Sequence, residues 1–460
     1  MEDIQKYYSV CAIAALMLLI LQPFLAAVVI LAFILLIILL AEKKRKVVLV
    51  FVIASLLVLT RTIDPTLRLI IQLLNYLLLS AIFFKQYEFQ LQNYPRFPKV
   101  IGGYIVLLLL LMIISSLHSQ HFYLGIFQVG RTMLFFYLIY LLYAFINDEK
   151  MIKSYLLSLF LVSIIYLSFL IYEFVQFNYD LLAFNISSNE VNGNSYIHKN
   201  ALGSFFVLNL LLLISFLFNH KYLRYRKWII LFAIIFTSGL VITNARAALI
   251  ALIVGIVFLI YHLRRTYLKY FVTILLMLAS FYFLLPIQKY IDMYFRFERI
   301  STGRDFILSS IWAVIKKNWL FGAGPAGSRY EMYKELPYML GSPEELYLRH
   351  HYEQIEFGHA HNFYLFFFSD LGIIGLILSL MLPFIFLKIS FQTISFLEKE
   401  KGENFYLSLG ITAFGIAMFV RGLFEWGGIL SYGTIGYDIP FWILFSIQLF
   451  LYQKYKTYNS

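Results

Sequence analysis

The chain has 460 residues, of which 61% are hydrophobic, 19% aromatic and only 13% charged, and its mean hydropathy is +0.80. A soluble protein of this length would have too little polar surface to face water, so the composition excludes an ordinary soluble enzyme or binding module. The formal net charge of +12 would suit an anionic partner, but the placement of the basic residues favours another cause.

Apolar runs of about 15–22 residues, the length of a membrane-crossing helix, recur along the whole chain. We predict helices at residues 9–21, 24–41, 47–60, 69–84, 100–117, 126–146, 154–175, 201–218, 228–242, 247–263, 269–286, 361–387, 405–426 and 439–452. The pairs 9–21/24–41 and 228–242/247–263 are either interrupted or separate helices, so we expect about 12–14 transmembrane helices. The fold class is therefore an all-α polytopic transmembrane helix bundle, forming one integral membrane domain over residues 1–460.

The first residues, MEDIQKYYSV, lack the basic start, short apolar stretch and small-residue cleavage site of a signal peptide. We therefore expect the first helix to be retained. The single cysteine, Cys11, lies in an apolar run, where we expect a structural thiol.

Basic residues gather in short segments between apolar runs. These are Lys43, Lys44, Arg45 and Lys46, then Lys221, Arg224, Arg226 and Lys227, then Arg264, Arg265 and Lys269. With the N-terminus inside, all three clusters fall on the cytoplasmic side, as the positive-inside rule requires. This charge pattern therefore predicts the lipid bilayer as the partner, and it does not indicate nucleic acid.

Two connections on the opposite side are long. Residues 176–200 are rich in Asn, Ser and Gly, and residues 287–360 form a large extracytoplasmic loop with nine Lys/Arg and nine Asp/Glu. We expect this loop to be partly helical. Ser301 can cap a helix that ends at Gly322 and carries an apolar stripe of Ile307, Leu308, Ile311, Trp312 and Ile315.

Two motifs have an ordinary structural interpretation. The segment GAGPAGS, residues 322–328, lacks the Gly-Lys-Ser/Thr ending of a phosphate-binding P-loop, and we interpret it as a tight turn after a helix. In HKNALGSFF, residues 198–206, Asn200 can cap a helix. Alternatively, Lys199, Asn200 and the backbone N–H groups of this helix start can bind phosphate.

Two arginines have no local helical reason for their positions. Arg246, in ITNARAALIAL, interrupts two apolar halves, and a charge near the bilayer centre costs about 2.5–3.5 kcal/mol unless it reaches the membrane surface. Arg304, in STGRDF, lies in a first helical turn, where the helix dipole disfavours a cation. Snorkelling of Arg246 and simple surface exposure of Arg304 are the alternatives to a functional role.

His359 and His361 precede the apolar run HNFYLFFFSDLGIIGL. Their spacing resembles a metal pair, but no nearby acidic or cysteine cluster completes a zinc shell, so we expect no metal site. A hydrogen-bonded structural histidine and an acid–base residue remain, and the neutral imidazole suits proton transfer near neutral pH.

Three features occur in order: TNARAAL, then STGRDF with the following Trp and LFGAG, then HAHNFYLFFFSDLGIIGL. Together they resemble the O-antigen ligase and polymerase superfamily of membrane glycosyltransferases. The resemblance covers about residues 190–390, and the usual Ser before the first Arg is here Ala245, which removes a hydroxyl at that point.

The resemblance implies a multi-pass protein of the bacterial cytoplasmic membrane. It would transfer a glycan from an undecaprenyl-diphosphate carrier to a glycan acceptor at the outer face, without metal or other cofactor. By resemblance, Arg246 and Arg304 hold the diphosphate and His361 activates the acceptor hydroxyl. Further candidates for substrate binding are Lys199, Asn200, Arg299, His359 and Asn362.

The residues leave the acceptor open. We favour a polymerase of O-antigen, capsule or exopolysaccharide repeat units, with chain-length regulator and flippase proteins as candidate partners. A ligase that transfers the glycan to lipid A-core or to protein is the alternative within the family. A polysaccharide flippase or transporter is the alternative from another class, although we find no internal repeat of the kind transporters favour.

Overall fold

The structure, a computed structural model, describes residues 65–88, 90–181, 184, 199–284, 292, 294, 304–335, 360–432 and 435–459. These residues form helices joined by turns, and eight of their helices are long and apolar enough to cross a membrane. The predicted all-α polytopic bundle is confirmed. The predicted helices at 9–21, 24–41 and 47–60 lie outside the described residues, so the total of about 12–14 stays a prediction.

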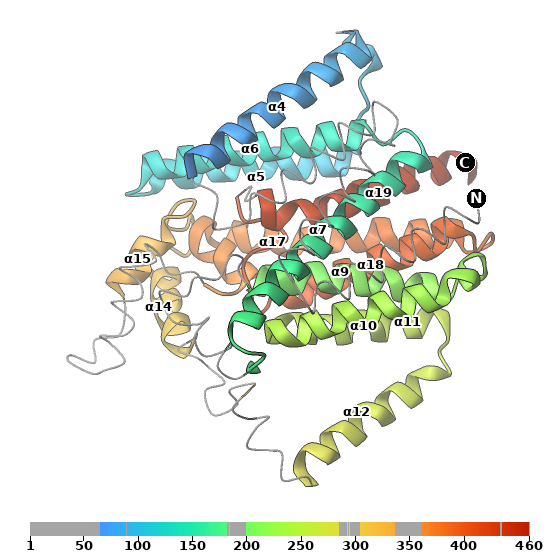
Figure 1. The fold of residues 1–460 in the computed structure, drawn as a ribbon. Helices are drawn as coiled ribbons and strands as arrows, with labels where there is room; N and C mark the ends of the chain where they lie inside the picture. Colours follow the sequence, from blue (N-terminus) through green and yellow to red (C-terminus); the bar gives the residue numbers. More distant parts are fainter. Residues whose placement is uncertain are drawn as a thin grey trace.

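Figure 1 shows the helices of the bundle in chain order. They are α4 (Pro65–Tyr87), α5 (Lys99–His118), α6 (Phe122–Ala144), α7 (Glu149–Gln176), α9 (Lys199–Leu217), α10 (Arg226–Thr243), α11 (Arg246–Leu263), α12 (Tyr267–Leu284), α14 (Arg304–Lys317), α15 (Ser328–Lys334), α17 (Phe363–Leu397), α18 (Glu403–Arg421) and α19 (Ile435–Asn459), with short 3-10 turns at Leu91–Asn93 and at η2 (His220–Tyr225).

Helices α10 and α11 are two separate helices, which resolves the alternative left open at 228–242/247–263. Helix α10 ends at Thr243, and Asn244 takes a left-handed conformation with φ 49°, which Asn adopts more readily than most residues. Helix α11 runs parallel to α9: a Cβ on Gly203 would lie 2.8 Å from the Cβ of Ala248, and one on Gly255 would lie 2.6 Å from Leu211. Since α10 runs back from the end of α9, the chain reverses at Asn244.

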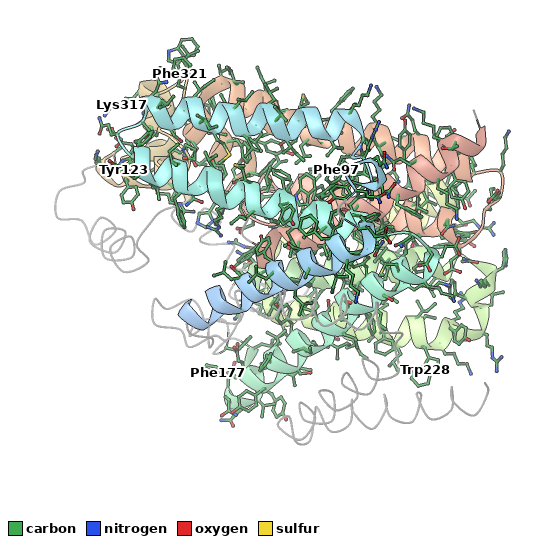
Figure 2. The ribbon with its side chains drawn as sticks, turned by 90° about the horizontal axis from the view of Figure 1, so that it is seen from above. Phe97, Tyr123, Phe177, Trp228, Lys317 and Phe321 are labelled. Carbon is green, nitrogen blue, oxygen red and sulfur yellow. The ribbon has the colours of Figure 1, made fainter. Side chains whose placement is uncertain are left out.

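The bundle has two chemically different ends. We use "His361 end" for the end that carries the Asn244 turn, the starts of α9 and α17, and helices α14 and α15 (Figure 1). The opposite end, the "Glu403 end", gathers predicted cytoplasmic charges: Glu403 pairs with Lys221 at 2.6 Å and Lys153 at 3.3 Å, and Glu149 pairs with Lys454 at 3.4 Å. In Figure 2, Tyr123, Lys317 and Phe321 lie toward one end and Trp228 toward the other.

Helices α17 and α18 differ from their predicted ranges of 361–387 and 405–426. Helix α17 continues to Leu397, because its polar residues after 387 interrupt the apolar run without breaking the helix. Helix α18 ends five residues early, at Arg421, where the sequence turns glycine-rich and the arginine side chain binds the following loop. Residues 422–432 therefore form a loop at the His361 end.

Helix α14, in the 287–360 segment, ends at Lys317 and not at Gly322 as predicted. Its stripe is only partly correct: Ile311 and Ile315 are buried, whereas Leu308 and Trp312 are 40% and 46% exposed. The chain turns after Lys317 because Gly322, with φ 74°, brings its backbone against α17, where Ala323 N–H donates to Ser369 O at 2.9 Å. The interpretation of GAGPAGS as a turn is confirmed.

The close approach between this turn and α17 needs two glycines. A Cβ on Gly322 would lie 2.2 Å from the backbone of Asp370, and one on Gly372 would lie 2.1 Å from the carbonyl oxygen of Leu320. Gly372 itself has φ 70° and ψ −164°, a kink that lets α17 accept the turn. The 287–360 segment is thus anchored in the bundle through residues 318–328, and its boundaries as an external loop stay a prediction.

Candidate functional site

His361 lies directly before α17, between Ala360 and the helix N-cap. Its φ of 47° is left-handed, a conformation that costs a residue with a Cβ about 1–2 kcal/mol. Such strain persists only where surrounding contacts enforce it, and it concentrates at functional sites. The strain supports a role for His361 beyond helix termination.

Asn362 is the N-cap that fixes this position. Its Oδ1 accepts from the N–H groups of Tyr364 and Leu365, both at 2.9 Å, and its Nδ2 donates to Leu423 O at 2.9 Å. The amide is therefore occupied at both ends by the protein itself. This structural role was not predicted from the sequence. Binding of substrate by Asn362 stays a prediction.

The loop 422–432 brings a carboxylate to the histidine. Phe363 N–H donates to Gly422 O at 2.7 Å, which joins the start of α17 to the end of α18. Three residues later, Glu425 Oε2 lies 3.7 Å from His361 Nδ1. The glutamate side chain is only 6% exposed while the histidine is 36% exposed, so the histidine forms the accessible side of the pair.

Asn200 holds the same glutamate from helix α9. Its Nδ2 donates to Glu425 Oε1 at 2.8 Å. Since α9 begins at Lys199, Asn200 lies inside the first turn and is not the N-cap, so the capping interpretation was wrong. Lys199 places its Nζ 3.8 Å from the centre of the Phe184 ring and 3.4 Å from Phe184 O. Binding of phosphate by this helix start stays a prediction.

Arg421, the last residue of α18, holds the Glu425 loop and the start of α9 together. Its side chain is buried, and it donates from Nη1 to Gly427 O at 2.6 Å and from Nη2 to Asn200 O at 3.0 Å. One guanidinium thus ties the loop 422–432 to the first turn of α9. A buried arginine in a membrane bundle is expensive, so its position indicates that this geometry matters to the protein.

Arg246 begins α11 at the same end of the bundle. The turn before it packs against the first turns of α9, because a Cβ on Gly203 would lie 2.8 Å from the Cβ atoms of both Ala245 and Ala248. Asn244 Nδ2 also donates to Tyr294 O at 2.6 Å, which links the turn to the beginning of the 287–360 segment. Arg246 is half-buried. Contacts through α9 therefore join the Arg246 turn to the Asn200–Glu425–His361 group.

Arg304 is the first residue of α14, as predicted, and this helix packs on α17 at the His361 end. Arg299 and His359, both predicted to bind substrate, lie outside the described residues. On α15, the guanidinium of Arg329 lies 5.5 Å from the centre of the Trp426 ring, next to Glu425. Burial lowers the pKa of Arg329, and the Asp370 carboxylate opposes that shift.

Among the residues that the structure describes, no group of three or more His, Cys, Asp or Glu side chains is arranged to hold a metal ion. Metal independence stays a prediction.

Sequence reasoning missed Glu425, Trp426 and Arg421, because residues 405–426 read as one apolar helix. The signal was present: Arg421 and Glu425 interrupt that run, and Gly422, Gly427 and Gly428 follow at the spacing of a helix end.

The comparison with protein families agrees with this geometry. Residues 231–380 match the family model described as O-antigen ligase. The matched segment runs from α10 into the middle of α17 and contains Arg246, Arg304 and His361. The match supports the resemblance of this region to the O-antigen ligase/polymerase superfamily.

No curated protein matches the sequence. The eight described helices that are long and apolar enough to cross a membrane, together with the family match, indicate a multi-pass bacterial membrane protein. The family match suggests glycosyl transfer and lipid-linked glycan substrates in a membrane environment.

Proposed function

We propose that this protein is a polymerase that transfers lipid-linked oligosaccharide repeat units from an undecaprenyl-diphosphate donor to a glycan acceptor. The reaction takes place at the outer face of the bacterial cytoplasmic membrane and uses no metal. O-antigen, capsule and exopolysaccharide chains are the products that fit this activity.

The grouping of a half-exposed histidine, a buried glutamate and the Arg246 turn at one end of the bundle carries the proposal. The His361 end is opposite the Glu403 end, where the lysines of the predicted cytoplasmic segments gather. A lipid carrier with its diphosphate at the outer membrane surface would meet the His361 end and leave its prenyl chain among the apolar helices.

The proposed step forms one bond and breaks one. The acceptor hydroxyl oxygen attacks the anomeric carbon of the donor sugar while the bond from that carbon to the phosphate oxygen breaks. His361 Nε2 takes the hydroxyl proton, and the electron pair of the broken bond leaves on the lipid diphosphate. Arg246 and Arg304 stabilise the charge that develops there, because fixed guanidinium donors match phosphate oxygens and need no reorganisation during the reaction.

A ligase is the second candidate, favoured by the description of the matching family model. The two activities leave different intermediates when the gene is deleted in its own host. Loss of a polymerase leaves single repeat units on the final acceptor, whereas loss of a ligase leaves long chains on the carrier lipid with none transferred. We expect the first pattern. Accumulation of long carrier-bound chains would assign the protein as a ligase.

A further inference from the structure

We propose that Glu425 is the positioning residue of the reaction: it holds the imidazole of His361 so that Nε2 faces the acceptor hydroxyl. This inference rests on the proposed function, because it assigns Glu425 a role only through His361. Neither the motifs of the sequence nor the family match, which ends at residue 380, contains this glutamate.

The two ring nitrogens of His361 lie in different environments. His361 Nδ1 is buried and makes no hydrogen bond within the part of the chain that the structure describes, while the side chain as a whole is 36% exposed. The accessible area therefore belongs to the rest of the side chain, which includes Nε2. A histidine that acts as a general base needs one ring nitrogen that reaches the substrate. Its other ring nitrogen faces the protein, where a positioning partner can hold it.

Glu425 is the group that faces the buried nitrogen. Its Oε2 lies 3.7 Å from Nδ1, which is longer than a hydrogen bond but short enough to shorten to one in the complex with substrate. A carboxylate beside Nδ1 fixes the tautomer with the proton on Nδ1. That leaves Nε2 free to accept a proton, and the carboxylate stabilises the imidazolium that forms.

The carboxylate is itself held in place. Asn200 Nδ2 donates to its other oxygen at 2.8 Å, and the backbone oxygen of Asn200 accepts from Arg421 at 3.0 Å. Asn200, predicted to bind substrate, thus serves to orient Glu425. The Glu425 carboxylate is only 6% exposed, and a buried charge is costly unless hydrogen-bond partners compensate for the lost water. The contacts with Asn200 and Arg421 provide this compensation.

The test is a double-mutant cycle on the purified full-length protein, with lipid-linked repeat units as substrate. Glu425→Gln keeps the shape and the acceptor for Asn200 but removes the charge. We expect kcat to fall about 10²-fold, the loss typical of a misplaced catalytic group, with the donor KM unchanged. In a His361→Asn background the same change should cost nothing further, because Glu425 acts through the missing imidazole.

Two further variants make the outcome decisive. Asn200→Ala should reduce kcat less than Glu425→Gln and should also be silent in the His361→Asn background, which tests the relay if Glu425→Gln folds poorly. The control is Glu331→Gln. Glu331 lies on α15 and pairs with another histidine, His121, at 3.3 Å, so its substitution should leave kcat unchanged.

The outcomes separate the two proposals. If His361→Asn loses activity but Glu425→Gln matches the unmodified protein, or if the losses multiply in the double variant, the positioning role is overturned while the proposed function stands. Full activity of His361→Asn would overturn the role of His361 as the base and, with it, the positioning role of Glu425, while the protein would remain a polymerase.

Discussion

Asp370, inside helix α17, accepts a hydrogen bond from the backbone N–H of Ser328 at 3.1 Å, and its second oxygen accepts from Ala326 at 2.8 Å. The only acidic residue of a 35-residue apolar helix therefore caps the start of α15. Through this contact the bundle fixes the part of the 287–360 segment that carries Arg329, and it does so next to the loop of Glu425.

The glycine kink beside this contact should be essential to stability. Gly372→Ala adds a Cβ 2.1 Å from Leu320 O at φ 70°, so backbone must move to accommodate it. We expect a clear fall in the thermal unfolding temperature in detergent, measured by tryptophan fluorescence. Gly130→Ala, in helix α6 with no atom within 4 Å of the new Cβ, should leave it unchanged or raise it. Equal effects of the two variants would contradict the anchoring role of the kink.

Removing the cap should have a similar effect for a different reason. Asp370→Ala leaves the N–H groups of Ala326 and Ser328 buried without their acceptor, and each such group costs about 1–3 kcal/mol. The unfolding temperature should fall and α15 should become sensitive to protease. An unchanged cleavage pattern around residues 328–334 would show that α15 is held by other contacts.

The sidedness of the bundle can be tested by cysteine labelling. In a background without Cys11, Lys334→Cys on α15 should react with an impermeant thiol reagent on intact cells, whereas Arg224→Cys at the Glu403 end should react only after permeabilisation. Ser328 is unsuitable as a probe because it is 2% exposed. The reverse labelling pattern would place the His361 end in the cytoplasm and exclude the proposed reaction site.

The two arginines should contribute through donor geometry as well as charge. Arg246→Ala and Arg304→Ala should weaken both donor binding and turnover, by about 10–100-fold if each loses a charge-assisted hydrogen bond of about 1.5–3 kcal/mol. Lysine should restore only part of the loss, because it cannot reproduce the planar grip on phosphate. Arg224→Lys, at the opposite end, is the matched control. Full rescue by lysine would reduce the role of either arginine to charge alone.

Much of this fold follows from hydropathy. Most described helices begin and end within four residues of their predicted apolar runs. The larger differences are an early start of α7, late ends of α17 and α19 and an early end of α18. The length of an apolar run reflects the thickness of the membrane. Helix α18 instead ends at Arg421 because the arginine side chain binds the glycine-rich loop that follows, and hydropathy does not predict such a contact.

The candidate site was only half predictable for the same reason. His361 and Arg246 stand out because polar groups in an apolar chain are conspicuous. Glu425 and Asn200 belong to the site through a contact between the loop 422–432 and helix α9. The two residues are 225 positions apart in the chain, and no local pattern encodes such a contact. Asn362 also stands out as a polar residue, but the sequence did not show that its side chain caps α17.

The central claim is that His361 removes the proton from the acceptor hydroxyl. The most direct measurement uses His361→Asn, since asparagine tolerates the left-handed backbone at φ 47° and should preserve the fold. At matched expression and unfolding temperature, we expect donor binding as in the unmodified protein and product formation slower by about 10²–10⁴-fold, the usual contribution of a general base. Normal long-chain product from His361→Asn would contradict the account and leave His361 with a structural role only.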